Sequence, residues 1–201
     1  PASVSRDDAG RLTVGGVDVL TLAQEHGTAA YVLDEEDFRS RARDFRDSFA
    51  GAFEPLAGAD VYYAGKAFLC TAVARWVEEE GLSLDVCTGG ELAVAQRVKF
   101  PGGRIGFHGN NKSVAEIRTA LTYGVGRIVV DSFQEIERIA VVAAELGVVA
   151  PVMVRVTVGV EAHTHEFIAT GHEDQKFGFS LAGGQAFEAA TRILARPDVF
   201  D

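Results

Sequence analysis

Residues 82–108 read LSLDVCTGGELAVAQRVKFPGGRIGFH, and this stretch decides the fold. It opens with an apolar run at 82–86, continues through a segment with helical spacing at 90–99, and closes with a second apolar run at 104–108. Two short strands joined through a helix and turn residues are typical of a βαβ unit, in which the strands are parallel. The stretch therefore predicts one complete unit of this kind.

The same pattern repeats on both sides of this stretch. Successive apolar runs begin about 21–24 residues apart, which is too long for a series of hairpins and fits consecutive βα units. Glycines stand where several of the helices are expected to end. The further strands are predicted at 61–64, 127–131 and 151–156, the further helices at 69–80, 113–123, 132–146 and 184–196, and the terminating glycines are Gly81, Gly124 and Gly147.

Two architectures share this rhythm: a doubly wound open sheet and a (β/α)8 barrel. The first strand lacks the G-x-G-x-x-G turn by which a dinucleotide-binding open sheet is recognised, so the even repeat favours the barrel. Only about five units are present, followed by a long loop at 159–178, and 199–200 could begin a sixth strand. We therefore expect the N-terminal part of a barrel, with strand edges that need covering.

A different pattern precedes the repeat. Runs at 12–14 and 17–20 flank Gly15-Gly16 and predict a short hairpin, and 31–33 predicts another strand. Asp34 is expected to cap a helix over 35–50. One face of that helix carries apolar side chains at helical spacing, namely Phe38, Ala42, Phe45 and Phe49.

The composition excludes several classes of function. The chain has 201 residues, 47% of them hydrophobic and 24% charged, which is a globular balance. A net charge of −10 without a basic cluster argues against nucleic-acid binding, and no apolar run is long enough to span a bilayer. With no apolar leader segment, Cys70 and Cys87 are expected to be free thiols. These features predict a soluble cytoplasmic protein that acts on small molecules.

Polar side chains gather at the predicted carboxyl ends of the strands, where a barrel carries its function. Lys66 is the most informative of them, because an ammonium among Tyr63, Ala67 and Phe68 is costly to desolvate unless it is paired or neutralised. A neutral amine suits Schiff-base chemistry, whereas a lysine paired at the rim is the equally weighted structural alternative. The full set is Lys66, Asp85, Cys87, His108, Asn110, Asn111, Asp131 and Arg155.

Several of these residues also have simpler interpretations. Cys87 is more readily a buried strand thiol than a nucleophile, and Asp131 more readily a helix cap than a catalyst. Gly89-Gly90 is interpreted as a strand-to-helix turn rather than a phosphate site. A polar active-site loop is favoured over a metal site for the cluster formed by Glu161, His163, His165, Glu166 and His172, so no metal is expected.

Four segments together resemble a known family. They are YAGKAF at 63–68, LDVCTGGEL at 84–92, FHGNNKS at 107–113, and VGVEAHTHEF at 158–167 with its sequel QKFG at 175–178. In this order and spacing they resemble the fold-type III pyridoxal-phosphate decarboxylases, and most closely the diaminopimelate decarboxylase branch in its actinobacterial form. The resemblance covers the chain from Tyr31 onward.

The resemblance implies an α/β fold of the alanine racemase-like (β/α)8 type, with about five units present. It assigns residues 1–33 to strands of a β domain and 34–201 to a partial barrel that binds pyridoxal 5'-phosphate. Lys66 matches the lysine that holds the cofactor, and it is the expected catalytic residue. The other expected cofactor-binding residues are Asp85, Glu91, His108 and Arg155.

The implied reaction is decarboxylation of meso-2,6-diaminopimelate to L-lysine in a homodimer. The family's phosphate loop and its pyridine-pairing acid are expected beyond Asp201, so this stretch is expected to be inactive by itself. Three alternatives stay open: a decarboxylase of another basic amino acid, an amino-acid racemase or cofactor-free aldolase on the same barrel, and a pyridoxal-phosphate-binding module without turnover.

Overall fold

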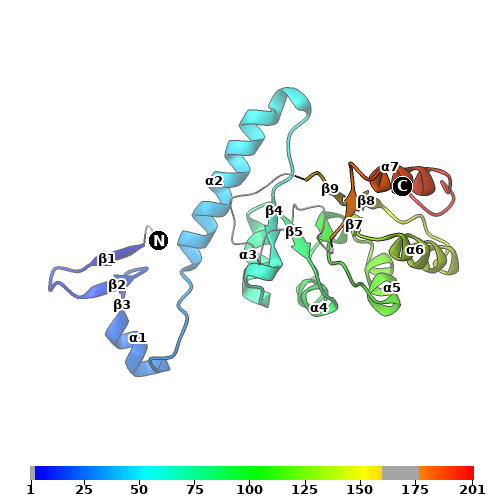
Figure 1. Cartoon of the computed structure of the whole chain (residues 1–201). Coiled ribbons are helices and arrows are strands. Elements are labelled where there is room, and N and C mark those ends of the chain that lie inside the picture. Colours follow the sequence, from blue (N-terminus) through cyan, green and yellow to red (C-terminus); the bar gives the residue numbers. More distant parts are fainter. Residues whose placement is uncertain (1–2, 160–176) are drawn as a thin grey trace. The chain divides into compact units, whose positions relative to one another are not determined.

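The computed structural model describes residues 3–159 and 177–201. By its contacts the chain divides into two compact units, residues 1–61 with 79–82 and residues 62–78 with 83–201 (Figure 1). Each unit carries its own sheet. The predicted domain boundary after residue 33 stays a prediction.

The second unit is built on a five-stranded parallel sheet. Its strands lie side by side in the order of the sequence, without the reversal of strand order that marks a doubly wound sheet. The predicted succession of βα units, arranged as in part of a barrel, is therefore confirmed. The strands are β4 (Tyr62–Ala64), β5 (Ser83–Val86), β6 (Ile105–Phe107), β7 (Arg127–Val130) and β8 (Val152–Val154).

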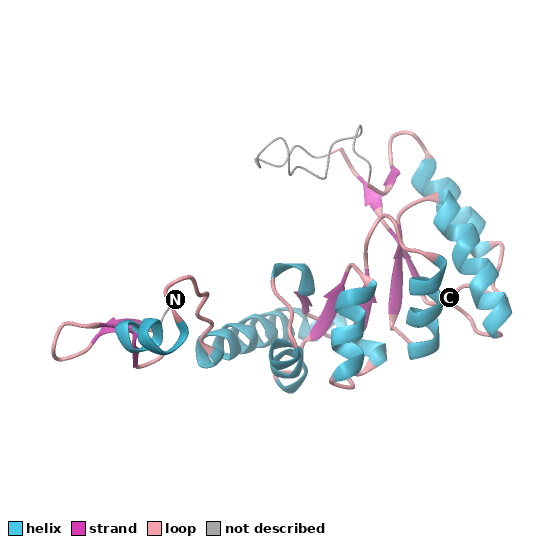
Figure 2. Ribbon diagram, turned by 90° about the horizontal axis from the view of Figure 1, so that it is seen from below, coloured by secondary structure: helices cyan, strands magenta, loops and turns pink. Residues whose placement is uncertain are grey.

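Helices follow the strands and lie along one face of the sheet (Figure 2). Local chemistry sets their ends. Ser113 and Glu116 form a reciprocal capping box, and the helices that end at Gly124 and Gly147 do so in the left-handed conformation that glycine adopts at little cost. The helices are α3 (Thr71–Glu79), α4 (Gly89–Arg97), α5 (Val114–Tyr123), α6 (Phe133–Leu146) and α7 (Gln185–Leu194), with short 3-10 turns η2 (Gly65–Ala67) and η3 (Gly102–Arg104).

The core of this unit lies between sheet and helices. Leu84, Phe107 and Ile128 in the strands and Ile117 and Ile136 in the helices are all fully buried. Removing side chains of this size from water stabilises a fold by about 1.5–3 kcal/mol each. The core thus holds the strand ends, and whatever they carry, in fixed positions.

The first unit begins with a small antiparallel sheet of β1 (Val4–Arg6), β2 (Leu12–Val14) and β3 (Val17–Asp18). The predicted hairpin is confirmed, but its second arm is shorter than expected because Asp18 caps the helix α1 (Val19–His26). After α1 come the long helix α2 (Glu35–Phe53) and the 3-10 turn η1 (Glu54–Leu56). Asp34 caps α2 as predicted.

One expectation for the first unit is wrong. Residues 31–33 form no strand, and Tyr31 is fully exposed, because β propensity alone cannot order a run beside which the described residues 3–159 and 177–201 place no strand to pair with. The apolar stripe of α2 is only partly covered. Ala42 is buried, whereas Phe45 is 60% exposed.

One pairing after β8 was not predicted. The strand β9 (Val156–Thr157) pairs in parallel with β10 (Phe179–Ser180). Residues 199–200 lie where a sixth strand was expected to begin: Phe200 forms a parallel bridge with Ala150, just before β8, and Val152 donates its N–H to the carbonyl of Asp201. Two-residue strands are too short to leave a periodic signal in the sequence.

Within the part of the chain that the structure describes, no helix combines the length and apolar character needed to cross a lipid bilayer.

Candidate active site

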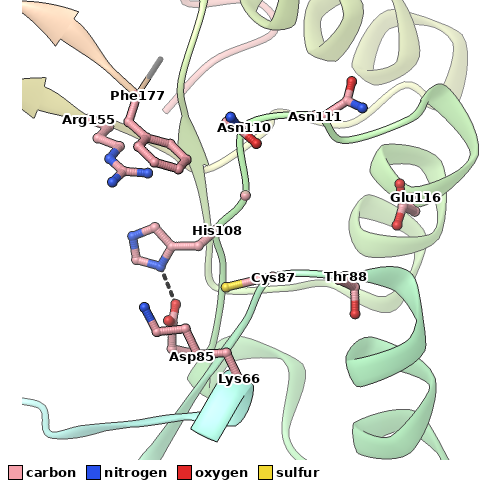
Figure 3. Close-up of a pocket in the computed structure, with 11 residues that line it drawn as sticks. Lys66, Asp85, Cys87, Thr88, His108, Asn110, Asn111, Glu116, Arg155 and Phe177 are labelled. Atoms are coloured by element: carbon pink, nitrogen blue, oxygen red, sulfur yellow. Dashed lines mark hydrogen bonds and ion pairs between the residues drawn. The ribbon is translucent and has the colours of Figure 1, made fainter. Parts of the chain in front are cut away.

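Residues at and after the carboxyl ends of the strands of the five-stranded sheet line an open cavity of about 560 Å³ in the second unit (Figure 3). This volume lies in the range of sites for small molecules and cofactors. Four of the five predicted cofactor-binding residues line it together. The lining consists of Lys66, Asp85, Cys87, Thr88, His108, Gly109, Asn110, Asn111, Glu116, Arg155 and Phe177.

Lys66 lies in η2, immediately after β4, and its side chain runs towards Asp85 and His108 (Figure 3). The expectation that apolar neighbours bury this amine is wrong, because Lys66, Ala67 and Phe68 are all exposed. Turning the chain through η2 directly after the strand leaves the lysine at the open side of the cavity. Its amine is therefore accessible to a reactive ligand.

Asp85 and His108 form a pair at the centre of the cavity. Oδ1 of Asp85 is hydrogen-bonded to Nδ1 of His108, and the ring lies between Lys66 on one side and Arg155 on the other (Figure 3). Asp85 is in β5 and His108 directly follows β6, so the parallel register of neighbouring strands brings them together. A carboxylate only accepts hydrogen bonds, so it holds the imidazole with Nδ1 as the donor.

Arg155 directly follows β8, and two contacts hold its side chain. Nη1 lies 3.1 Å from Oδ1 of Asp131, and the guanidinium carbon lies 4.4 Å from the centre of the Phe177 ring. Asp131 is therefore not the helix cap that the sequence suggested. Ser132 caps α6, and the Asp131 carboxylate instead binds Arg155 and the backbone N–H of Gly178.

Glu91 stands apart from the other predicted residues. Its carboxylate is not in the cavity lining and accepts the backbone N–H of Cys87, so it supports the turn between β5 and α4. The Glu116 carboxylate accepts the Gly89 N–H at 2.7 Å, which occupies a donor that a phosphate would need at this helix start. These contacts agree with a strand-to-helix turn at Gly89-Gly90.

Cys87 is half-buried and lines the cavity, so it is less enclosed than the buried strand thiol that the sequence suggested. Burial raises the pKa of its thiol, and the nearby charges of Asp85 and Glu91 raise that pKa further. A thiol in this environment stays protonated at neutral pH and is a weak nucleophile.

The sequence interpretation missed a buried charged pair, Lys112 and Glu135, beside the cavity. One signal could have found it. Glu135 stands one residue before Ile136 and four before Ile139, so it falls on the buried face of the predicted helix. The predicted histidine-rich cluster at 161–172 lies outside the described residues.

Comparisons with known proteins single out one family. Residues 35–199 match the family model described as pyridoxal-dependent decarboxylase, pyridoxal binding domain. The diaminopimelate decarboxylase of Mycobacterium tuberculosis (strain H37Rv) is 56% identical over 195 residues, which cover 97% of this chain and 42% of that protein. The diaminopimelate decarboxylase of Bacillus subtilis (strain 168) is 49% identical over 92% of this chain and 42% of its own length.

Solved structures agree with these matches. The crystal structure of diaminopimelate decarboxylase from M. jannaschii in complex with L-lysine has a TM-score of 0.89 at 32% identity, covering 98% of this chain and 46% of that one. The enzyme from Helicobacter pylori with L-lysine has a TM-score of 0.79 at 26% identity, covering 92% and 45%. The chain thus spans less than half the length of these relatives.

Proposed function

The chain belongs to the pyridoxal-dependent decarboxylases, matching their pyridoxal-binding domain, and on this premise we propose that its native protein decarboxylates meso-2,6-diaminopimelate to L-lysine. The observation that carries the proposal is the amine of Lys66 at a cavity of cofactor size within this domain. The 56% identity to a diaminopimelate decarboxylase supports the substrate.

The residues of the cavity fit pyridoxal 5'-phosphate. The cofactor offers an aldehyde, an aromatic ring and anionic oxygens. Lys66 supplies an amine for the aldehyde, and Arg155 and His108 supply donors for anionic oxygens. A cavity of about 560 Å³ has room for the cofactor together with a small amino acid.

The cofactor, when bound, serves as the electron sink for the pair of electrons that carbon dioxide leaves behind. Lys66 would hold the cofactor by a bond between its amine and the aldehyde carbon. The exposed position of Lys66 would leave room beside this bond for the amine of a substrate.

The other site residues orient and bind. Asp85 fixes the ring of His108, so that its Nε2 edge is presented to the cavity in a constant orientation. The Arg155 guanidinium has five N–H donors, of which Asp131 uses one in a direct contact, so others remain for an anionic oxygen of the cofactor. Glu91 is proposed to act indirectly, from outside the cavity lining, by accepting the backbone N–H of Cys87 and so supporting the cavity wall there.

The remaining expectations are proposals of the same kind. We place residues 1–33 in a β domain and 34–201 in the partial barrel, which the antiparallel sheet of β1–β3 supports. The native protein is proposed to be a cytoplasmic homodimer, as the family resemblance implies. Light scattering of the full-length protein tests the dimer.

The test uses the full-length native protein with pyridoxal 5'-phosphate. Borohydride reduction followed by peptide mapping is expected to place the cofactor on Lys66, and meso-2,6-diaminopimelate is expected to yield equal amounts of carbon dioxide and L-lysine. The variant Lys66→Ala should lose both results. Its matched control is Lys99→Gly, which removes another exposed amine at a position whose φ of 60° glycine accepts.

Each alternative that uses the cofactor has its own outcome in this test, and a cofactor-free aldolase would show no cofactor on Lys66 after reduction. Inversion of the substrate's stereochemistry without release of carbon dioxide would identify a racemase. If carbon dioxide were released only from another basic amino acid, that amino acid and not meso-2,6-diaminopimelate would be the substrate. Attachment of the cofactor to Lys66 without turnover of any substrate would indicate a pyridoxal-phosphate-binding module. Label on a different lysine would contradict the site itself.

A further inference from the structure

Lys112 and Glu135 are the two charged side chains that the proposed chemistry does not use and that the fold buries most completely among the described residues. Their side chains are 0% and 2% exposed. Neither lines the cavity. Lys112 lies in the loop between β6 and α5, and Glu135 in the first turn of α6, so the pair joins two neighbouring βα units.

The Lys112 ammonium holds two backbone segments at once. Its Nζ donates to the carbonyl of Gly109 at 2.6 Å and to the carbonyl of Val129 at 2.7 Å, and lies 3.1 and 3.2 Å from the two carboxylate oxygens of Glu135. Gly109 follows His108 in the cavity wall, and Val129 is in β7. All the donor capacity of the ammonium is therefore used to tie the His108 loop to β7.

The Glu135 carboxylate continues this connection towards Arg155. Its Oε2 accepts the backbone N–H of Asp131 at 2.8 Å, at the end of β7. The Asp131 side chain in turn contacts Nη1 of Arg155 at 3.1 Å and the N–H of Gly178 at 3.2 Å. One chain of contacts thus runs from the His108 loop through the buried pair to Arg155.

Stability alone is a weak reason for such a pair. Burial lowers the pKa of Lys112 and raises that of Glu135, so each group is costly to keep charged. Replacing both members of a buried ion pair by well-packed neutral side chains is often neutral or stabilising. A neutral pair would no longer orient the groups on either side, which are the His108 loop and the contact between Asp131 and Arg155.

We propose that Lys112 and Glu135 are positioning residues, which hold the His108 loop and the Asp131–Arg155 contact in the arrangement that binds pyridoxal 5'-phosphate. This inference rests on the proposed function. It adds that the cofactor site depends on two buried residues that never touch the cofactor.

The test is the double variant Lys112→Met with Glu135→Gln in the full-length native protein. Methionine keeps roughly the length of lysine, and glutamine keeps an oxygen for the Asp131 N–H. The matched control is Arg118→Met with Glu145→Leu, which removes an exposed ion pair joining α5 to α6 away from the cavity. Two quantities are measured: Tm without cofactor, and Kd for pyridoxal 5'-phosphate from its visible absorption.

The double variant is expected to keep its Tm within a few degrees while Kd rises roughly 10- to 100-fold, by analogy with the loss of metal affinity when the hydrogen-bond partners of metal ligands are removed. The visible absorption band of the bound cofactor at saturation should also shift, because His108 and Arg155 would be oriented differently towards the cofactor in the variant than in the wild type. The control should change neither quantity.

Any other pattern overturns the inference. Unchanged Kd and spectrum in the double variant would show that the pair does not position the site. A lost fold, or a fall in Tm that accompanies the loss of affinity, would make the pair a stability element. A wild-type protein with no visible cofactor band would instead overturn the proposed function, and this inference with it.

Discussion

Asp85 and His108, 23 residues apart in the sequence, are joined by a hydrogen bond between Oδ1 and Nδ1 at the centre of the cavity. The bond fixes the imidazole in one orientation, with a proton on Nδ1 that is donated to the carboxylate of Asp85. The opposite edge of the ring, which carries Nε2, is then presented to the cavity in a constant orientation. Both residues are held by adjacent parallel strands, so the pair is built into the sheet itself.

The variant Asp85→Asn is expected to weaken the binding of pyridoxal 5'-phosphate about 10- to 100-fold. A hydrogen bond to a charged group contributes about 1.5–3 kcal/mol, and the amide that replaces it can present a donor to Nδ1 instead. Absorbance titration of the full-length protein measures the effect. Asp198→Asn, at an exposed position outside the cavity lining, is the control, and equal affinity of the two variants would contradict the role of the pair.

Glu116 predicts a pH dependence of stability. Hydrogen bonds from the backbone N–H and the hydroxyl of Ser113, and then from the N–H of Gly89, lower the pKa of this carboxyl below its ordinary value of 4.5. The folded protein therefore binds this proton less readily than the unfolded chain does. The resulting stabilisation is fully present above pH 4.5 and is lost as the pH falls through the folded-state pKa.

The measurement is the free energy of unfolding in urea between pH 3 and 7, on a scale set by roughly 1.4 kcal/mol per pKa unit. Glu116→Gln keeps the capping box but removes the titrating group, so its stability should fall less steeply than that of wild type below pH 4.5. Parallel curves for the two proteins would refute the assignment.

Cys87 predicts slow alkylation. Because burial and the charges of Asp85 and Glu91 raise the pKa of its thiol above 9.0, little thiolate exists at neutral pH. In a Cys70→Ser background, iodoacetamide should label Cys87 more slowly than it labels glutathione at pH 8, and faster as the pH rises past 9. Bound pyridoxal 5'-phosphate should slow the labelling further, since Cys87 lines the cavity. Rapid labelling at pH 7 that the cofactor does not affect would be inconsistent with this environment.

Gly126, just before β7, and Gly103, in η3, form a matched pair for a stability test. A Cβ added at Gly126 would lie 2.1 Å from the carbonyl oxygen of Gly103, whereas one added at Gly103 would meet nothing within 4 Å. Gly126→Ala is therefore expected to cost about 1–3 kcal/mol in the free energy of unfolding, and Gly103→Ala less than about 0.5 kcal/mol. Urea denaturation compares them, and similar values for the two would mean that the backbone at 126 is not confined.

The parallel βα units could be predicted from the sequence because their causes are local. Periodic apolar runs, Ser113 as a cap and Gly124 as a terminator each act within a few residues. The same reasoning failed at 31–33, where propensity found no strand to pair with, and at Lys66, whose exposure depends on the turn of η2. Local signals predict that an element forms, but they do not predict which other parts of the chain it contacts.

The sequence by itself thus determined the order of strands and helices and placed Lys66, Asp85, His108 and Arg155 at strand ends. Only the tertiary structure decided that Asp131 binds Arg155 rather than capping α6, and that Lys112 and Glu135 are buried together. The physical reason is distance along the chain. Contacts between residues more than 20 positions apart depend on how the units pack, and no periodicity within one unit records that packing.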